Sequence, residues 1–261
     1  MLYVHEQNLE TKIRKDYNHK GALIANFRDQ YYLPTRRELL SLQFNENNMA
    51  SFERATALFN NYYDQIDAFS HQHGITSQSK FASTFLEEFS VYLFKDIPEI
   101  VNEEYGVFNK KIYAGLKIKN DRHIGIITKD VDFCIGKKST ITIDGVDRVD
   151  LIVPIVAVEV KTYLDATMFG EIKSSSKAIR SASPNSRAYV LMGYKDLADE
   201  HIIAAKQDST LTEMFALRED AQSPVVADAV YQYWKEIKTA IASTTIADEI
   251  NSVGRLLRPI G

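Results

Sequence analysis

The chain has 261 residues, of which 45% are hydrophobic and 25% charged, a composition typical of soluble globular proteins with a substantial buried core. Its 31 basic and 35 acidic side chains give a formal net charge of -4, so no global positive field would hold a polyanion, and any site for one has to be a local patch. The single cysteine, Cys134, excludes an intrachain disulfide framework and a multi-cysteine zinc site. The chain does not start like a secretory signal and lacks an apolar stretch of roughly 18 residues, so we expect a cytoplasmic protein with no membrane partner.

The first third of the chain is predicted to be helical. Over residues 4–94, apolar residues recur at helical intervals, glycines are few and no segment alternates cleanly between apolar and polar residues. Thr35 and Glu38 have the spacing of a capping box, which predicts that a helix starts there. Residues 48–69 predict a long helix that packs along one face.

Strand-like segments begin near residue 112 and continue to about residue 163. The clearest strand is 151–160, LIVPIVAVEV, which is almost continuously apolar and is therefore expected in the middle of a sheet. Pro154 predicts a bulge or an unpaired edge position within it, because proline cannot donate to a strand ladder. Just before this strand, Asp144-Gly145 is a hairpin signal.

The remaining segments complete a mixed architecture. Asp165 can cap a helix that runs to about residue 179, and residues 187–192 predict another strand, so that strand, helix and strand would form a crossover unit. A short strand near 214–217 and a helix over 225–242 follow. The pattern predicts an α/β protein of the α+β type, a single domain over residues 1–261 with a mixed central sheet flanked by helices and a helical N-terminal layer.

Two opposite charges stand where the central apolar run stops. In Glu159-Val160-Lys161 the carboxylate and the ammonium project from the same face, because side chains alternate along a strand. Charges at the end of a buried strand are costly unless they are paired or used. The three other triplets of this form begin at residues 10, 171 and 236 and lie in helical patterns, where they are typical of solvated surface charge. We therefore take Glu159 and Lys161 as a candidate site.

A second carboxylate is needed nearby if the site is to bind a hard divalent cation such as Mg2+. The candidates are Asp130, Asp132 and Asp150. An extended strand would place Asp150 roughly 30 Å from Glu159 at ~3.3 Å per residue, which excludes it.

Hairpin register decides between the other two acids. A two-residue turn at Asp144-Gly145 would place Asp130 opposite Glu159, whereas a four-residue loop would place Asp132 there, and a five-residue loop would place neither on its face. We prefer Asp132 because the apolar residues 133–135 that follow it form a strand, and Asp130 remains the alternative.

These residues resemble the PD-(D/E)XK nuclease superfamily, whose best-known members are type II restriction endonucleases. The resemblance covers about residues 79–194: a strand aspartate, a hairpin, Glu-x-Lys on a central strand, then helix and strand. VEVKTYLDATM, from residue 158, and SKFASTFLEEFSVYLFKDI, from residue 79, resemble restriction enzymes that cut short, slightly asymmetric sites. Here the aspartate follows Val131 where the family pattern has proline. The resemblance implies a bacterial protein with a catalytic core over residues 79–261, and a region over 1–78 for DNA recognition or dimerisation.

The same resemblance implies roles for the site residues. Asp132 and Glu159 would be metal ligands, helped by the Val160 carbonyl, and Lys161 would lie beside the attacking water. The metal would be Mg2+, with Mn2+ able to substitute, and hydrolysis would leave a 5'-phosphate. Many members add a glutamate from a preceding helix, and here residues 79–94 form that helix.

Two glutamates compete for this auxiliary role. Phe81, Phe85 and Phe89 belong to the predicted buried face of the helix over 79–94, and Glu88 flanks that face, whereas Glu87 points about 100° away from Glu88. We therefore predict Glu88 as the auxiliary carboxylate.

Candidate DNA contacts are basic residues. Arg36 and Arg37 would lie in the first turn of a helix, where cations oppose the helix dipole unless a phosphate lies nearby. A second group clusters in sequence around the predicted site and would form a basic cleft in an acidic protein: Lys110, Lys111, Lys117, Lys119, Arg122, Lys137 and Lys138.

The sequence thus predicts a Mg2+-dependent, site-specific endonuclease that cuts double-stranded DNA. Cutting two strands with one site per subunit favours a homodimer, although enzymes of the resembling subgroup can use two different subunits. The alternatives are a superfamily nuclease of DNA repair or junction resolution, and a non-catalytic DNA-binding protein with a relic fold.

Overall fold

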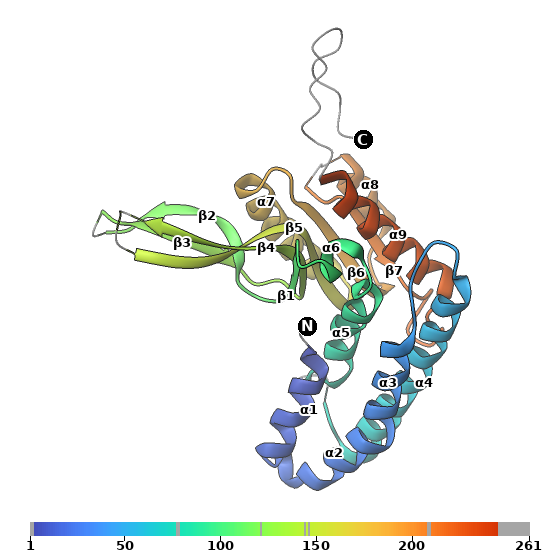
Figure 1. Ribbon diagram of the computed structural model, residues 1–261. Coiled ribbons are helices and arrows are strands. Elements are labelled where there is room, and N and C mark those ends of the chain that lie inside the picture. Colours follow the sequence, from blue (N-terminus) through green and yellow to red (C-terminus); the bar gives the residue numbers. More distant parts are fainter. Residues whose placement is uncertain are drawn as a thin grey trace.

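The computed structural model describes residues 3–76, 79–120, 122–143, 145, 147–207 and 210–244. Its N-terminal third is a layer of helices that extends away from the sheet (Figure 1). The helices of this layer and the two that follow it are α1 (Val4–Arg14), η1 (Tyr17–His19), α2 (Gly21–Phe27), η2 (Arg28–Tyr32), α3 (Leu33–Ser41), α4 (Met49–His73), α5 (Phe81–Phe94) and α6 (Pro98–Val101).

The helix predicted to start at Thr35 does not start there. The backbone is helical from α2 through the π-helical turn η2 into α3, with Tyr32 and Leu33 both in the right-handed helical region. Thr35 is buried inside this continuous run, so no free helix end exists for a capping box to satisfy. The long helix expected over 48–69 is confirmed as α4, whose first turn is capped by the Asn48 side chain.

A five-stranded mixed sheet forms the centre, in the order β1-β4-β5-β6-β7. The β1–β4 and β4–β5 pairs are antiparallel, and the β5–β6 and β6–β7 pairs are parallel. The apolar run over 151–160 lies in β5, the middle strand, as predicted. The strands are β1 (Gly106–Phe108), β2 (Ile112–Ile118), β3 (Ile124–Lys129), β4 (Phe133–Ile143), β5 (Asp147–Leu164), β6 (Arg187–Lys195) and β7 (Glu213–Ala216).

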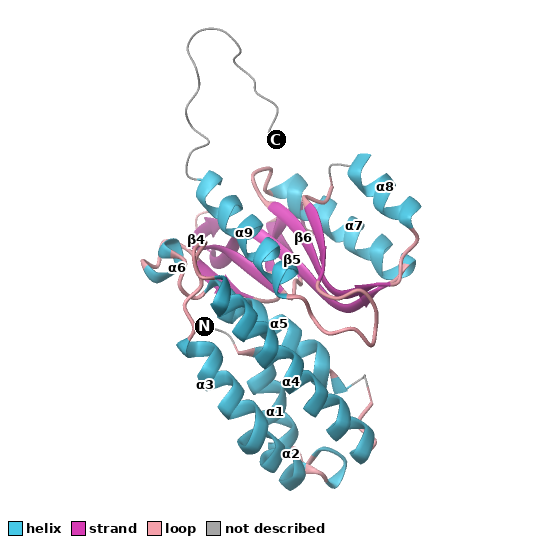
Figure 2. Cartoon of the chain, turned by 90° about the vertical axis from the view of Figure 1, so that its right-hand side faces the viewer, coloured by secondary structure: helices cyan, strands magenta, loops and turns pink. Residues whose placement is uncertain are grey.

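Helices cover both faces of this sheet (Figure 2). On one face α5 and α9 (Ala227–Thr244) pack on Val156, Val158 and Val160, and α4 packs on these two helices. On the other lie α7 (Ala166–Ala182) and α8 (Asp199–Gln207). The Asp165 side chain caps α7 by accepting from the Met168 N–H, and the parallel β5–α7–β6 connection confirms the predicted crossover unit. The predicted fold class, a mixed central sheet flanked by helices with a helical N-terminal layer, is confirmed.

Two arms leave the body of the molecule in different directions (Figure 1). One consists of the β2–β3 hairpin together with the outer halves of β4 and β5, and β2 also packs against α7. The other is the helical layer α1–α4. The N-terminus, β1 and α5 lie in the corner between the arms.

Candidate active site

The candidate site lies at the inner end of the β4–β5 hairpin, where the apolar run of β5 stops. Lys161 Nζ lies 3.3 Å from Glu159 Oε2, so the two side chains share one face of the strand as predicted. Both are half-buried or more, with exposed fractions of 30% for Lys161 and 16% for Glu159. At this depth each charge needs a partner.

Asp132, the residue just before β4, supplies that partner. Its Oδ2 accepts a hydrogen bond of 2.8 Å from the Val160 N–H and lies 3.2 Å from Lys161 Nζ. The cross-strand pair Phe133–Val158 next to it places Asp132 opposite Glu159. One ammonium group therefore holds two carboxylates from neighbouring strands.

A bulge in the hairpin creates this register. Ile143 pairs with Asp147, which leaves three residues between the strands, so the predicted two- and four-residue connections are both wrong. Without any irregularity in the ladder, this three-residue connection would place Asp132 opposite Val158. However, Gly136 pairs with Pro154 and Ile135 with Val156, so Ile155 is the extra residue of a β-bulge. The bulge predicted at Pro154 is confirmed, and it shifts the ladder by one residue so that Asp132 meets Glu159.

The two rival aspartates lie elsewhere. Asp130 is exposed in the link between β3 and β4, and among the described residues it makes no hydrogen bond to the segment 159–161. Asp150 lies on the arm, where it binds Lys138 at 2.9 Å and accepts a hydrogen bond from Thr140. Asp132 is therefore the aspartate that the fold brings to Glu159.

The charges in this cluster alter one another. Burial and the nearby Asp132 raise the pKa of Glu159 to about 7, against the opposing effect of Lys161. Burial alone would lower the pKa of Lys161, but Asp132 and Glu159 outweigh it, so that this pKa is raised and the ammonium stays protonated.

The prediction that Glu88 is the auxiliary carboxylate of the site is wrong. Glu88 is fully buried on a different side of α5, about 100° around the helix from Glu87. It accepts the backbone N–H groups of His5 and Glu6 in the first turn of α1, and the hydroxyls of Tyr32 and Tyr92. Glu88 thus fastens α1 and the η2 turn onto α5. The physical reason for the error is that α5 lies between the helical layer and the sheet, so both of its sides are covered and the apolar residues do not mark the side that faces the site.

Glu87 is the glutamate that faces the site. It lines a small cavity together with Asp132, Asn109 and Val4. Burial and the Asp132 charge raise the pKa of Glu87 to about 7, while Lys80, Lys161 and Lys110 act to lower it. The available sequence signal was the helical wheel, on which Glu87 points away from Glu88, but the wheel does not say which side meets the sheet.

The donor set fits a hard divalent cation. Asp132 and Glu159 already converge on one positive charge, Lys161 Nζ. Because the N–H and C=O of a strand residue point to the same edge, and the Val160 N–H points at Asp132, the Val160 carbonyl is directed toward that side too. Across the residues that the structure describes, no three His, Cys, Asp or Glu side chains form a closed cluster. Two carboxylates and one carbonyl would suit an ion that keeps several water ligands, as Mg2+ does.

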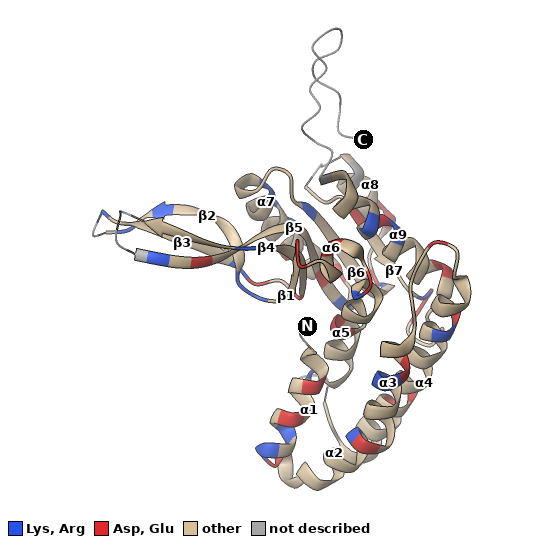
Figure 3. Cartoon of the chain, viewed as in Figure 1, with Lys and Arg blue, Asp and Glu red and all other residues tan. Residues whose placement is uncertain are grey.

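Two lysines bring positive charge to this corner. Lys110 and Lys80 both act on Glu87, and both are exposed. Lys110 and its predicted companion Lys111 lie in the loop between β1 and β2, where basic residues face the corner between the arms (Figure 3). The sequence did not point to Lys80, because it lies 30 residues before that cluster, at the start of α5.

The other predicted DNA contacts are spread out. Lys117 lies on β2, and Lys119 and Arg122 lie at the tip of the β2–β3 hairpin. Lys138 is ion-paired with Asp150 and, like Lys137, lies roughly 15 to 20 Å along β4 from Asp132 at ~3.3 Å per residue.

Arg36 and Arg37 do not lie in the free first turn of a helix as predicted, because α3 continues η2. Arg36 instead lies over the Tyr3 ring at 4.4 Å and 3.5 Å from Glu6, and Arg37 is exposed. These contacts give Arg36 a role in fixing α1 to α3.

The model of one protein family, the Bpu10I restriction endonuclease, matches residues 78–226, more than half of the chain. The chain belongs to the Bpu10I restriction endonuclease family. The part matched to Bpu10I contains Asp132, Glu159, Lys161 and Glu87, and the predicted resemblance to type II restriction endonucleases is confirmed. Asp132, Glu159 and Lys161 in the corner between the arms remain the candidate active site.

A solved structure supports the Bpu10I assignment at the level of the fold. A chain of the structure titled "native BbvCI A2B2 tetramer at low resolution" superposes with a TM-score of 0.76, covering 97% of this chain and 100% of that chain at 15% sequence identity. No curated protein matches the chain. Within the described ranges, no helix is both long and apolar enough to cross a bilayer.

Proposed function

We propose that this chain is a Mg2+-dependent, sequence-specific endonuclease that hydrolyses phosphodiester bonds of double-stranded DNA and leaves 5'-phosphates. The observation that carries the proposal is the convergence of Asp132 and Glu159 on the Lys161 ammonium at the end of β5. Membership of the Bpu10I family supports the choice of DNA as the substrate.

Each residue of the site has a chemical role in this proposal. Asp132, Glu159 and the Val160 carbonyl would hold Mg2+, or Mn2+ in its place. The ion would polarise the phosphoryl oxygen and lower the pKa of a bound water. Lys161 stays protonated, so it can orient the attacking oxygen and stabilise the negative charge that develops on the phosphate. Glu87, on the other side of Asp132, would accept a hydrogen bond from a metal-bound water.

A single chain offers one such site, whereas a double-strand break needs two. We propose that the chain works in an assembly with a second nuclease subunit, either another copy of itself or a related chain. The BbvCI structure is titled as an A2B2 tetramer, which supports an assembly of this kind.

The test is digestion of plasmid and phage DNA with Mg2+ and with EDTA. Discrete fragments in Mg2+ support sequence-specific cleavage, whereas a smear or cutting only at branched structures would support a nuclease of repair or junction resolution. Lys161→Ala and Asp132→Ala should each lower the cleavage rate by roughly 100-fold or more. Asp130→Ala is the matched control and should retain the rate of the unmodified protein. Undiminished cleavage by the Lys161 or Asp132 variant would refute the assigned site.

A further inference from the structure

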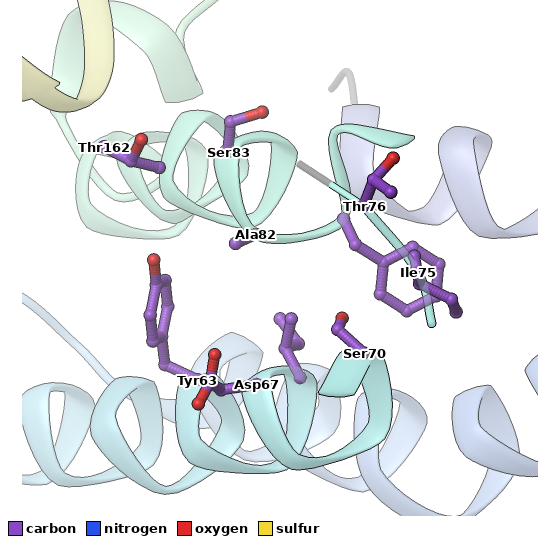
Figure 4. Close-up of a pocket in the computed structure, with 10 residues that line it drawn as sticks. Tyr63, Asp67, Ser70, Ile75, Thr76, Ala82, Ser83 and Thr162 are labelled. Atoms are coloured by element: carbon purple, nitrogen blue, oxygen red, sulfur yellow. The ribbon is translucent and has the colours of Figure 1, made fainter. Parts of the chain in front are cut away.

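A second feature lies next to the catalytic corner and has no part in the chemistry above. Helix α4 faces the ends of β5 and β6 across a groove of about 630 Å³, lined by Tyr63, Thr162, Tyr194 and Arg218 among others. It continues into a cavity of about 250 Å³ between α4 and the first turns of α5, where Tyr63 points toward Thr162 (Figure 4). We call the larger space the Arg218 groove.

An arginine is held between two aromatic rings in this groove. The Arg218 guanidinium lies 5.2 Å from the Tyr63 ring centre and 5.3 Å from that of Tyr194. Tyr194 in turn stacks on Tyr163 at 6.0 Å, so the stack runs from the catalytic strand to α4. Within the described part of the chain, no carboxylate forms a salt bridge with Arg218. Burial raises the pKa of Tyr63, and a hydrogen bond from the Arg218 guanidinium to its hydroxyl acts to lower it. The faces of the guanidinium are covered by the rings, and its remaining edge N–H donors can bind a ligand.

Hydrogen bonds within the protein order the loop that carries Arg218. The Arg218 backbone N–H donates to the Gly193 carbonyl at the end of β6. Further along the loop, the Asp220 side chain accepts from the backbone and the hydroxyl of Ser223. The Asn60 side chain of α4 both accepts from and donates to the Val225 backbone. Arg218 is therefore held in place, which reduces the entropy that a contact to it would cost.

The groove adjoins the catalytic residues on two sides. Thr162 in its wall follows Lys161 directly in β5, with its side chain on the other face of the strand. Ser83, in the wall of the adjoining cavity, is one helical turn before Glu87 on the same side of α5, at roughly 5 to 6 Å. DNA bound for cleavage at Lys161 would therefore bring nucleotides beside the scissile phosphate within reach of the groove.

The charged residues that line the Arg218 groove indicate which part of DNA it would bind. Asp64 and Asp67 are exposed on the α4 side and would repel phosphate oxygens. A carboxylate can accept from the N4 amine of cytosine, and a planar guanidinium can donate two parallel hydrogen bonds to O6 and N7 of guanine. A groove lined by an arginine and by aspartates matches the edge of a G·C pair better than it matches the backbone.

We propose that the Arg218 groove reads one G·C base pair beside the cleaved bond, with Arg218 binding guanine and Asp67 binding cytosine. This inference rests on the proposed function for the choice of DNA as the ligand. Tyr63 and Tyr194 are positioning residues that fix the orientation of the guanidinium plane relative to the base edge.

To test this, Lys161→Ala protein, in which cleavage is suppressed, is used to select the DNA duplexes that it binds from a random-sequence library. The same selection is made in that background with Arg218→Ala, with Asp67→Asn and with Arg54→Ala. Arg54 is the matched control, because it is an exposed arginine of α4 paired with Glu38. We expect one G·C position that is fixed in the parent and in the Arg54 variant, and a roughly 5- to 150-fold loss of preference at that position alone with Arg218→Ala. Asp67→Asn should relax the same position.

Three results would overturn the proposal. The first is that the Arg218→Ala variant selects the same preferred sequence. The second is that this variant loses affinity equally for all sequences. The third is that the Lys161→Ala protein without a second substitution enriches no sequence. Thermal melting of each variant shows whether it has folded, and Arg218→Lys provides a second variant that keeps the charge but loses the planar fork. The readout does not depend on cleavage. A chain that selects the base pair but cuts no DNA would keep this inference and refute the proposed nuclease.

Discussion

Two neighbouring glutamates on α5, Glu87 and Glu88, have different surroundings and different roles. Glu88 is fully buried and accepts four hydrogen bonds that fasten α1 and η2 to α5, and burial raises its pKa. Glu87 faces Asp132 and carries no such network among the described contacts. Because adjacent helix positions differ by about 100°, one residue serves the scaffold and the other the site.

Substitution should separate these roles. Glu87→Gln removes a charge beside Asp132, so we expect cleavage to fall by roughly 10- to 100-fold with little change in stability. Glu88→Ala leaves two backbone N–H groups and two hydroxyls without their acceptor, so we expect a loss on the order of 3 kcal/mol in unfolding free energy. Urea denaturation and cleavage rates measure both effects. The same phenotype for both variants would contradict the assignment.

The raised pKa values make metal binding depend on pH. Both Glu159 and Glu87 have a pKa of about 7, so they hold protons below that pH and must lose them to attract a cation. We expect Mg2+ affinity to rise between pH 5 and 7, by up to roughly tenfold per pH unit for each proton released, and to level off above pH 7. Calorimetric titration with Mg2+ at several pH values measures this rise. A constant affinity over that range would refute it.

The same groups should affect the stability of the metal-free protein. Their folded pKa of about 7 lies above the ordinary value of 4.5, so the stability they contribute is present below about pH 4.5 and is lost as the pH rises through 7. Melting temperatures with EDTA should therefore fall over that window, and Mg2+ should restore part of the loss at pH 8. Glu87→Gln should flatten the dependence.

At the scale of elements, the β4–β5 hairpin decides whether the site exists. Its three-residue connection and the bulge at Ile155 compensate each other, and together they place Asp132 opposite Glu159. Gly136 stands opposite this bulge, where a Cβ atom would lie 2.4 Å from the Val153 carbonyl oxygen. The contact is with backbone, so it cannot be relieved by a side-chain rotation.

Gly136→Ala should therefore disturb the register. We expect a loss of roughly 1 to 3 kcal/mol in stability and a fall in cleavage, because the bulge has to move. Gly170→Ala in α7 is the matched control: a Cβ there meets nothing within 4 Å, so the variant should be neutral or more stable by up to ~1 kcal/mol. Equal stability of the two variants in urea would contradict the account of the bulge.

At the scale of the whole molecule, an acidic protein concentrates positive charge at one corner. The net charge is -4, but Lys80, Lys110 and Lys161 surround Glu87 where the two arms meet. Lys138, on the β arm, is already neutralised by Asp150. A local patch of this kind binds a polyanion through released counterions, so its contribution depends on salt.

Salt titrations should distinguish these lysines. Lys80→Ala and Lys110→Ala should each weaken DNA binding for all sequences and lower the slope of log affinity against log salt by about one. Lys138→Ala should change the slope less. Fluorescence anisotropy with labelled duplexes measures the slopes, and an unchanged slope in the Lys80 and Lys110 variants would place the DNA elsewhere.

Strand cutting should depend on assembly. Each chain has one Lys161 and would cut one strand. Below the dissociation constant of the assembly, the main product from plasmid DNA should therefore be nicked circles and not linear DNA. Gel analysis of the products and sedimentation at the same concentrations test this. Linear product as the first product of a species that sediments as a monomer would contradict it.

Local patterns determined much of the fold. The apolar run of β5, the helical periodicity of α4 and the Asp165 cap of α7 are properties of short segments, and all were confirmed. Glu159 and Lys161 belong with them, because strand alternation alone places both side chains on one face.

Contacts between distant segments decided the rest. Asp132 depends on a bulge at Ile155, 23 residues away, and Glu87 depends on which side of α5 meets the sheet. Arg218 depends on a stack with rings from α4 and β6. The sequence by itself determined the pair Glu159 and Lys161 at the end of a buried strand. Only the tertiary structure decided which carboxylates join them, because register and helix orientation come from packing between elements and not from the periodicity of any one of them.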